Sequence, residues 1–223
     1  MTPRTVRRSR GALAVGLGLA IAAASCTPRA AAPPIERPYG GPLVDPATVP
    51  HDFLDRQQIT ATYGERTARF DAVLQKRGPE LTILALTPFG SRAFVLRQLR
   101  AEVTFQSFVP QTMPFPPKYI LIDVQRVYFA WAEPSPDAGA SPDLEARDRR
   151  VERDGEIETE HWEGGTLRRR TFRRGDGEPP GEITIDYGGT GMSADGTPPA
   201  HVTFVNGWYG YRLEIATVSH QPL

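Results

Sequence analysis

Apolar and polar residues alternate at every second position along most of the chain, a pattern typical of half-buried β-strands. In the stretch 67–76, Phe70, Ala72 and Leu74 share one face, and Asp71 lies on the other. Short turn signals between these stretches leave no room for crossover helices, which favours antiparallel pairing. Strands are expected at residues 57–63, 67–76, 80–87, 91–99, 101–108, 149–153, 156–162, 166–173, 182–187, 201–205 and 209–218.

A helical period interrupts the strands after four prolines between positions 110 and 117. Apolar residues then recur at three- and four-residue spacing, which predicts a well-covered helix over 118–131. The residues that set this period are Ile120, Val124, Val127, Tyr128 and Trp131. The stretch 133–148 that follows is rich in Pro, Ser, Ala and Asp, which predicts a flexible loop.

About ten or eleven antiparallel strands are more than a flat open sheet usually carries, so the sheet must curl. The sequence therefore predicts a mainly β (α+β) fold: an incomplete antiparallel β-barrel whose single helix fills or caps the concave side. A sandwich of two sheets is the alternative fold.

The amino terminus has the features of a secretion signal. Four arginines and no acid precede the uncharged apolar stretch 11–24, which is too short to span a bilayer, and small residues then lead to Cys26, the only cysteine. This arrangement predicts a lipoprotein signal peptide over 1–25 and a lipid-modified Cys26, where more than one acyl chain would give durable anchoring. An ordinary signal peptide with an incidental cysteine is the alternative. Arg7 and Arg8 leave the choice between general and twin-arginine export open.

The mature chain divides into a Pro- and Ala-rich tether over 26–50 and one domain over 51–223. Removing the signal takes away four of the 26 basic residues and none of the 26 acidic ones, which leaves 22 against 26. Basic residues gather at 147–153 and 168–174, but acids interleave or flank them, so solvated strand faces are expected and nucleic acid is not an expected partner. A lone cysteine excludes an intramolecular disulfide.

Signatures of catalysis and metal binding are weak. The stretch 191–195 departs from the hydrolase nucleophile elbow at its last position and lacks the strand-to-helix context. His161 lies near Glu163, but a solvated strand position is the favoured interpretation, and the glutamates that alternate along 156–160 are expected to form an exposed face. No enzyme activity, metal or cofactor is expected. The four scattered histidines, which lack the spacing of metal ligands, are His51, His161, His201 and His220.

Three stretches, in this order, resemble the outer-membrane lipoprotein receptor of the Lol sorting pathway and its uncharacterised lipoprotein relatives. The first is the strand–turn–strand Leu-Ala-Leu-Thr-Pro-Phe-Gly-Ser at 84–91. The second is the Pro-rich entry at 113–116 to the expected helix, and the third runs from Ile-Asp-Tyr-Gly at 185–188 to the paired strands that end at 213–215. The resemblance covers most of the chain from about residue 57 and is greatest to the relatives whose activity is not established.

This resemblance implies an incomplete barrel, similar to the carrier and receptor of that pathway, whose apolar interior takes acyl chains. It also implies that Phe89, at the tip of the first turn, protrudes and probes the membrane; a Phe89 that folds back on the barrel rim is the alternative. Inward-facing apolar residues are candidates for lining the cavity, with plain core packing as the alternative. These candidates are Leu84, Leu86, Phe94, Leu96, Val103, Phe105, Val124, Tyr128, Ile185, Phe204 and Leu213.

The function expected from these features is that of a periplasm-facing lipoprotein, anchored to the outer membrane, which binds or transfers acylated or apolar cargo. Thr27 after the cysteine is compatible with outer-membrane sorting. The expected partners are the membrane itself and a lipid cargo or a periplasmic lipoprotein carrier. The alternative is a structural or adaptor lipoprotein of an envelope assembly machine, with a filled barrel and no ligand.

Overall fold

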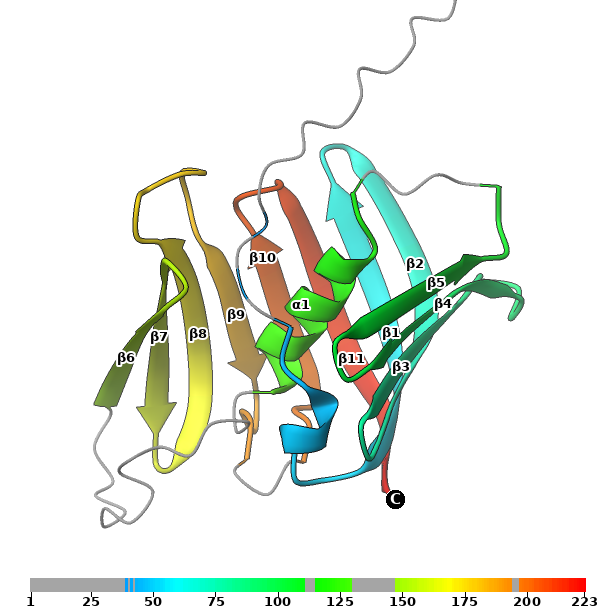
Figure 1. Ribbon diagram of the computed structural model, residues 1–223, viewed down its shortest axis with the longest axis horizontal. Coiled ribbons are helices and arrows are strands. Elements are labelled where there is room, and N and C mark those ends of the chain that lie inside the picture. The colour runs from blue at the N-terminus through cyan, green and yellow to red at the C-terminus, as the bar shows by residue number, and fades with distance from the viewer. Residues whose placement is uncertain (1–38, 40, 42, 111–114, 130–146, 194–196) are drawn as a thin grey trace, which may run out of the picture. The chain divides into compact units, whose positions relative to one another are not determined.

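All the strands that the computed structural model describes belong to one antiparallel sheet (Figure 1). The structure describes residues 39, 41, 43–110, 115–129, 147–193 and 197–223, all within the compact unit Pro34–Leu223. The strands of this part are β1 (Phe53–Tyr63), β2 (Arg66–Arg77), β3 (Glu80–Leu86), β4 (Arg92–Leu99), β5 (Glu102–Ser107), β6 (Arg147–Arg153), β7 (Glu156–Glu163), β8 (Thr166–Arg174), β9 (Ile183–Gly188), β10 (His201–Asn206) and β11 (Tyr211–Pro222).

The strand order is β5-β4-β3-β2-β1-β11-β10-β9-β8-β7-β6. Because β1 pairs with both β2 and β11, two meanders meet at the first and last strands, and β5 and β6 form the two edges. The expected incomplete antiparallel barrel is confirmed, since one sheet with two unjoined edges is neither a closed barrel nor a two-sheet sandwich.

The central strands are longer than the sequence pattern predicts. β1 begins at Phe53 instead of residue 57, and β11 runs to Pro222 instead of residue 218, because these ends pair with each other. Asp55 and His220 sit in this extension, joined by a 2.6 Å contact between carboxylate and imidazole. The alternation pattern missed this extension, because polar residues occupy inward-facing positions where the pattern requires apolar ones.

Helix α1 (Lys118–Tyr128) lies across the concave side of the sheet (Figure 1). Its buried residues include Leu121, Ile122, Val127 and Tyr128, so the expected heavy coverage is found. Its carboxyl end is satisfied by the sheet: the Tyr187 hydroxyl donates to the Val127 carbonyl at 2.8 Å, and the Arg170 guanidinium donates to the carbonyl of Arg126. Trp131, the last residue of the expected helix, lies outside the described residues, as does most of the expected loop over 133–148.

The segment before β1, expected to be a tether with little core-forming capacity, packs into the domain. We call its described residues, 39, 41 and 43–49, the strap. Tyr39 and Val49 are 8% and 1% exposed and belong to the main core. The domain therefore starts before residue 51. The strap includes the short 3₁₀-helix η1 (Pro46–Thr48), which Asp45 caps through a 2.9 Å hydrogen bond from the Ala47 N–H.

The strap is held by side chains that bind its backbone. Gln125 of α1 accepts a hydrogen bond from the Val44 N–H at 2.8 Å and donates one to the Val44 carbonyl at 3.0 Å. Gln98 of β4 donates to the same carbonyl at 2.9 Å. At the far end, the buried ammonium of Lys76 donates to the Val49 carbonyl at 2.6 Å and pairs with Asp52 at 2.7 Å.

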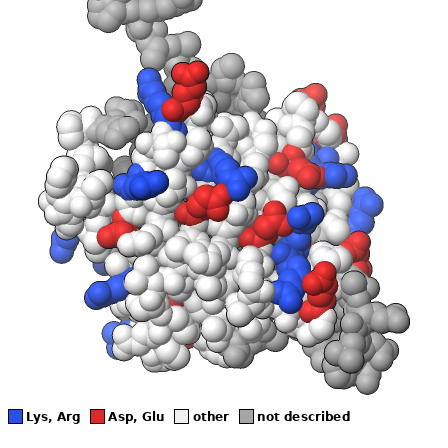
Figure 2. All heavy atoms as spheres, turned by 180° about the vertical axis from the view of Figure 1, so that it is seen from behind, with Lys and Arg blue, Asp and Glu red and all other residues white. Residues whose placement is uncertain are grey.

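The back of the sheet is a mixed polar surface. Figure 2 shows this side, where basic and acidic side chains lie next to one another and neither sign forms a broad patch. Arg173 pairs with Glu182 at 2.7 Å, and Arg169 pairs with Asp186 at 2.5 Å. The outward-facing part of the 168–174 cluster is thus solvated, as expected, but Arg170 turns inward.

Cys26 and the expected signal peptide lie outside the described residues, so lipid modification stays a prediction. In the part of the chain that the structure describes, no helix has the length and apolarity needed to cross a bilayer.

Candidate functional site

The concave side has two parts with opposite chemistry, one on each side of α1. Toward β6–β8 lies a buried ionic cluster, and toward β4–β5 lies an apolar surface. Each is built by residues far apart in the sequence.

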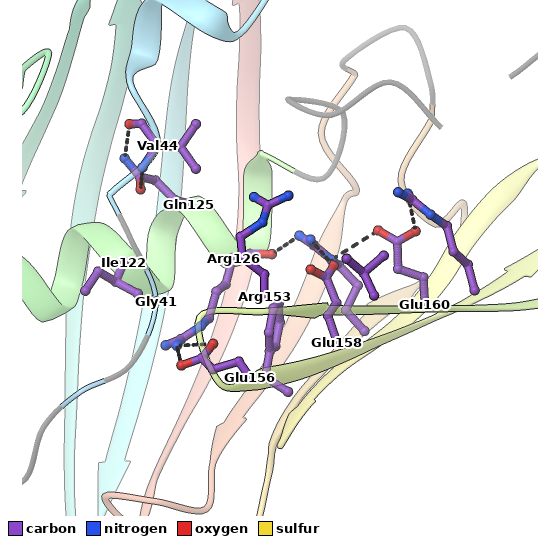
Figure 3. Close-up of a pocket in the computed structure, with 13 residues that line it drawn as sticks. Gly41, Val44, Ile122, Gln125, Arg126, Arg153, Glu156, Glu158 and Glu160 are labelled. Atoms are coloured by element: carbon purple, nitrogen blue, oxygen red, sulfur yellow. Dashed lines mark hydrogen bonds and ion pairs between the residues drawn. The ribbon is translucent and has the colours of Figure 1, made fainter. Parts of the chain in front are cut away.

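Arg126 of α1 lies at the centre of the ionic cluster. Its guanidinium donates to both carboxylate oxygens of Glu156 on β7, at 2.8 and 3.0 Å, as Figure 3 shows. It also donates to Asp123, one helical turn earlier, at 3.1 Å. All three side chains are at least nine-tenths buried. Both contacts with Glu156 come from one nitrogen, Nη2, while Nη1 binds Asp123. Hydrogen bonds between two charged groups are stronger than neutral ones, and these fix α1 against β7.

Aromatic rings enclose the same guanidinium. Its carbon lies 4.7 Å from the ring centre of Tyr39 and 5.2 Å from those of Phe172 and Trp208. The hydroxyls of Tyr39 and Tyr211 donate to the Asp123 carboxylate. Burial raises the pKa of Asp123, while Arg126 and the two hydroxyls oppose that shift. The cluster therefore joins the strap, the helix and three strands through one compensated charge centre.

A second group of charges continues along β7 and β8. Arg170 pairs with Glu158 and lies 3.5 Å from a carboxylate oxygen of Glu160. Glu160 also accepts from Arg149 at 3.2 Å and from the Trp162 indole at 3.1 Å. Burial raises the pKa of Glu160, and Arg170 opposes that shift. The expectation that the glutamates along 156–160 form an exposed face is wrong: Glu156 and Glu160 are buried, because their partners arrive from α1, β6 and β8.

A small cavity separates α1 from this charged wall (Figure 3). Its volume is about 100 Å³, below the roughly 300 Å³ at which ligand pockets usually begin. Each of the three glutamates that line the cavity pairs with an arginine, so their charges are compensated without a charged ligand. The lining residues are Gly41, Val44, Ile122, Gln125, Arg126, Arg149, Val151, Arg153, Glu156, Glu158, Glu160, Arg170 and Phe172.

The other side of α1 is apolar. We define the apolar surface as five partly buried residues that pack on the main core, together with the more exposed Phe105, which packs on one of them. Phe94 and Phe105 meet across β4 and β5 with ring centres 5.7 Å apart, and Phe105 is 36% exposed. The apolar surface consists of Ile59, Phe94, Val103, Phe105, Val124 and Leu213.

The remaining cavity-lining candidates fall into two groups. Four of them are fully packed core: Leu96, Tyr128, Ile185 and Phe204. The other two, Leu84 and Leu86, lie on the opposite face, because the register of β3 turns Leu81, Ile83 and Ala85 toward the core. Their assignment to the interior is corrected: they share a face with Glu80 and Thr82, whose polar side chains mark it as the outer face of β3.

Phe89 protrudes from the turn between β3 and β4. The turn is closed by hydrogen bonds from the Thr87 N–H to the Ser91 carbonyl at 2.7 Å and from the Gly90 N–H to the Thr87 carbonyl at 2.9 Å. Gly90 has φ +77°, a conformation that residues other than glycine rarely adopt. With 94% of its surface exposed, Phe89 does not fold back on the sheet.

The histidines and the stretch after β9 offer little chemistry. His161 lies between Asp148 at 2.7 Å and Glu163 at 3.3 Å on an exposed hairpin, and the hydrogen bond with Asp148 raises its pKa. Met192 pairs with Leu167 as an isolated β-bridge, so 191–193 are not the strand-to-helix turn of a hydrolase. Among the described residues, no three His, Asp, Glu or Cys side chains gather as metal ligands would.

Comparison with known proteins identifies the family. The model of DUF3261, a protein family of unknown function, matches residues 55–219. The chain belongs to the DUF3261 family. The expectation of an uncharacterised family is thereby confirmed. No curated protein matches the chain.

Solved structures similar to this DUF3261 protein include proteins of the expected superfamily. A LolA superfamily protein of Nitrosomonas europaea has a TM-score of 0.43 at 9% identity, covering 80% of this chain and 91% of its own. A putative outer membrane lipoprotein-sorting protein domain of Vibrio parahaemolyticus has 0.43 at 8%, with 77% and 85% covered. A DUF1329 family protein of Desulfovibrio piger has 0.39 at 10%, with 78% and 87% covered. At TM-scores below 0.5, these similarities carry no information on function.

Proposed function

We propose that this DUF3261 protein is a lipid-anchored envelope protein that binds the acyl chains of an amphiphilic cargo on its apolar surface. It holds or passes on that cargo next to the outer membrane without changing it chemically. The observation that carries the proposal is the apolar surface itself, on the concave side of the sheet, which α1 leaves partly uncovered.

Physical chemistry supports this role for the apolar surface. Each methylene of an acyl chain that leaves water gains about 0.8 kcal/mol, so a few methylenes on Phe94, Phe105 and Val103 suffice for reversible binding. The side chains of this surface carry no charge or hydrogen-bonding group, so they select for apolar groups. Anchoring through Cys26 would keep the site close to a supply of lipid.

A filled interior favours a second candidate function, that of an adaptor without a ligand. The β6–β8 side of the helix is occupied by the ionic cluster, and the cavity there, about 100 Å³, is smaller than ordinary ligand pockets. In this role the fold would present surfaces to partner proteins, and the apolar surface would belong to an interface.

The two functions are separated by the substitution Phe105→Asp. A charge at this partly exposed position should abolish saturable binding of an environment-sensitive fatty acid probe, because the carboxylate would lose water when the chain docks. The matched control is Thr104→Asp, which places the same charge on the other face of β5. Both variants are titrated with the probe as unacylated protein, and lipids that co-purify are measured by mass spectrometry.

Carrier function requires that the wild-type protein binds the probe and that only Phe105→Asp loses it. No saturable uptake by the wild-type protein, together with no co-purified lipid, favours the adaptor. Equal loss in both variants would show that the probe binds elsewhere.

Phe89 is proposed to enter the membrane surface during transfer. A Phe side chain that leaves water gains about 1.5–3 kcal/mol, which suits reversible insertion. Phe89→Asp should therefore slow delivery of a bound fatty acid probe to liposomes while leaving probe binding unchanged, because Phe89 lies outside the apolar surface. Phe89→Leu serves as the control, and transfer that is equally fast in all three proteins would exclude this role.

A further inference from the structure

Strand β5 forms one edge of the sheet and is exposed on both of its faces. In the described part of the chain its sole strand partner is β4 (Figure 1). Of its six residues, Val103 alone is partly buried. Such an edge offers unpaired backbone groups to another strand.

The hydrogen-bond register shows which backbone groups β5 offers. The Phe108 N–H donates to the Ala93 carbonyl at 2.9 Å, which makes 93 and 108 a hydrogen-bonded pair. Hydrogen-bonded and non-hydrogen-bonded pairs alternate in an antiparallel ladder. The Cα partners of β4 and β5 therefore leave the N–H and C=O groups of Val103, Phe105 and Ser107 directed away from β4.

The two edge strands differ in how strongly their side chains discourage pairing with a strand of another chain. β6 reads Arg-Asp-Arg-Arg-Val-Glu-Arg, so six of its seven residues are charged. Charged side chains on an edge strand discourage pairing with another chain. β5 reads Glu-Val-Thr-Phe-Gln-Ser, with a single charge at its first residue. Exposed apolar residues also gather near β5, since Leu99 and Phe108 flank it.

The sequence of β5 is compatible with pairing to itself. In an antiparallel pair centred on Phe105, Val103 lies opposite Ser107 of the second copy and Thr104 lies opposite Gln106 of the second copy. All three outward-directed residues then pair, side chains of the concave face meet side chains of the same face, and no like charges oppose each other. We infer that this protein forms a two-fold dimer in which the β5 edges of two copies join into one continuous sheet.

The dimer is expected to be weak in solution. A pair of six-residue strands buries less than the roughly 1,000 Å² of a lasting interface. Attachment of both copies to one membrane would raise their effective concentration and favour the pair without new contacts. The inference does not depend on the proposed function, because it rests on backbone groups and not on acyl-chain binding.

The test uses sedimentation equilibrium of the mature chain carrying Cys26→Ala, from micromolar to millimolar concentration. Thr104→Lys with Gln106→Lys places lysine opposite lysine at two pairs and should raise the dimer dissociation constant at least about tenfold. Thr104→Lys with Gln106→Glu places lysine opposite glutamate in the same register and should leave that constant unchanged or lower it. Both positions are exposed, so the fold is retained, which circular dichroism checks.

A wild-type chain that stays monomeric over this whole range would overturn the inference. So would a dimer whose dissociation constant is the same in both double variants, because its interface would then lie elsewhere. Neither double variant alters the apolar surface, so acyl-probe binding reports on the proposed function separately.

Discussion

Arg126→Ala is expected to destabilise the protein by about 3–5 kcal/mol, because it removes the guanidinium that pairs with Asp123 and Glu156 and leaves Glu156 with the longer 3.9 Å contact to Arg174. Asp123 and Glu156 would both keep a carboxylate in a site from which water is largely excluded. Arg126 also fills the space between Tyr39, Phe172 and Trp208, so its removal costs packing as well. The measurement is the urea concentration at the midpoint of unfolding. It compares the stabilities of the two proteins if the unfolding free energy falls with urea at the same slope in both.

The matched control for Arg126→Ala is Arg173→Ala, which breaks an exposed ion pair with Glu182. Exposed pairs of this kind contribute about 1 kcal/mol or less. If the two substitutions lower the urea midpoint equally, the buried ionic cluster contributes no more to stability than an exposed ion pair.

A chain that begins at His51, the expected start of the domain, should lose about 4 kcal/mol or more of stability compared with a chain that begins at Pro34. Removing the strap exposes the core side chains that Tyr39 and Val49 cover, and it leaves Lys76, Gln125 and Asp123 with fewer partners. Thermal and urea unfolding of the two chains give the comparison directly.

The control for this truncation is a chain that begins at Thr27, whose stability should match that of the Pro34 chain within about 0.5 kcal/mol. Adding a peptide of residues 34–50 to the His51 chain should restore part of the loss. If the His51 chain is as stable as the other two, the strap is not a structural part of the domain.

Much of the fold could be predicted because strands and turns leave local signals. Alternation placed β2 and β7, and the short gap between the expected strands 149–153 and 156–162 matches the hairpin between β6 and β7. Periodicity gave the helix its start at Lys118. The face of β3 was misjudged because its second half, 83–86, is apolar at every position; only Glu80 and Thr82 in its first half distinguish the outer face from the inner one.

The ionic cluster was beyond the reach of sequence patterns for a different reason. Glu156 lies 30 residues from Arg126, and Tyr39 lies 84 residues from Asp123. A glutamate on a strand is usually exposed, and only the arrival of α1 over β7 makes this one buried. One signal was available: charged residues inside a helix that is otherwise apolar on several faces, Asp123 and Arg126, must find partners when that helix is covered.

The docked strap also sets how far the domain can travel from its point of attachment. If Cys26 carries the lipid, a leash from Cys26 to His51 would reach about 85 Å when fully extended, at roughly 3.4 Å per residue. Because Tyr39 is already fixed in the core, the usable leash ends there and reaches only about 45 Å. With a lipid on Cys26, the strap would thus halve the height to which the domain can rise above the membrane. With that anchor, Phe89 and the apolar surface would search a thin layer next to the lipid instead of the open periplasm.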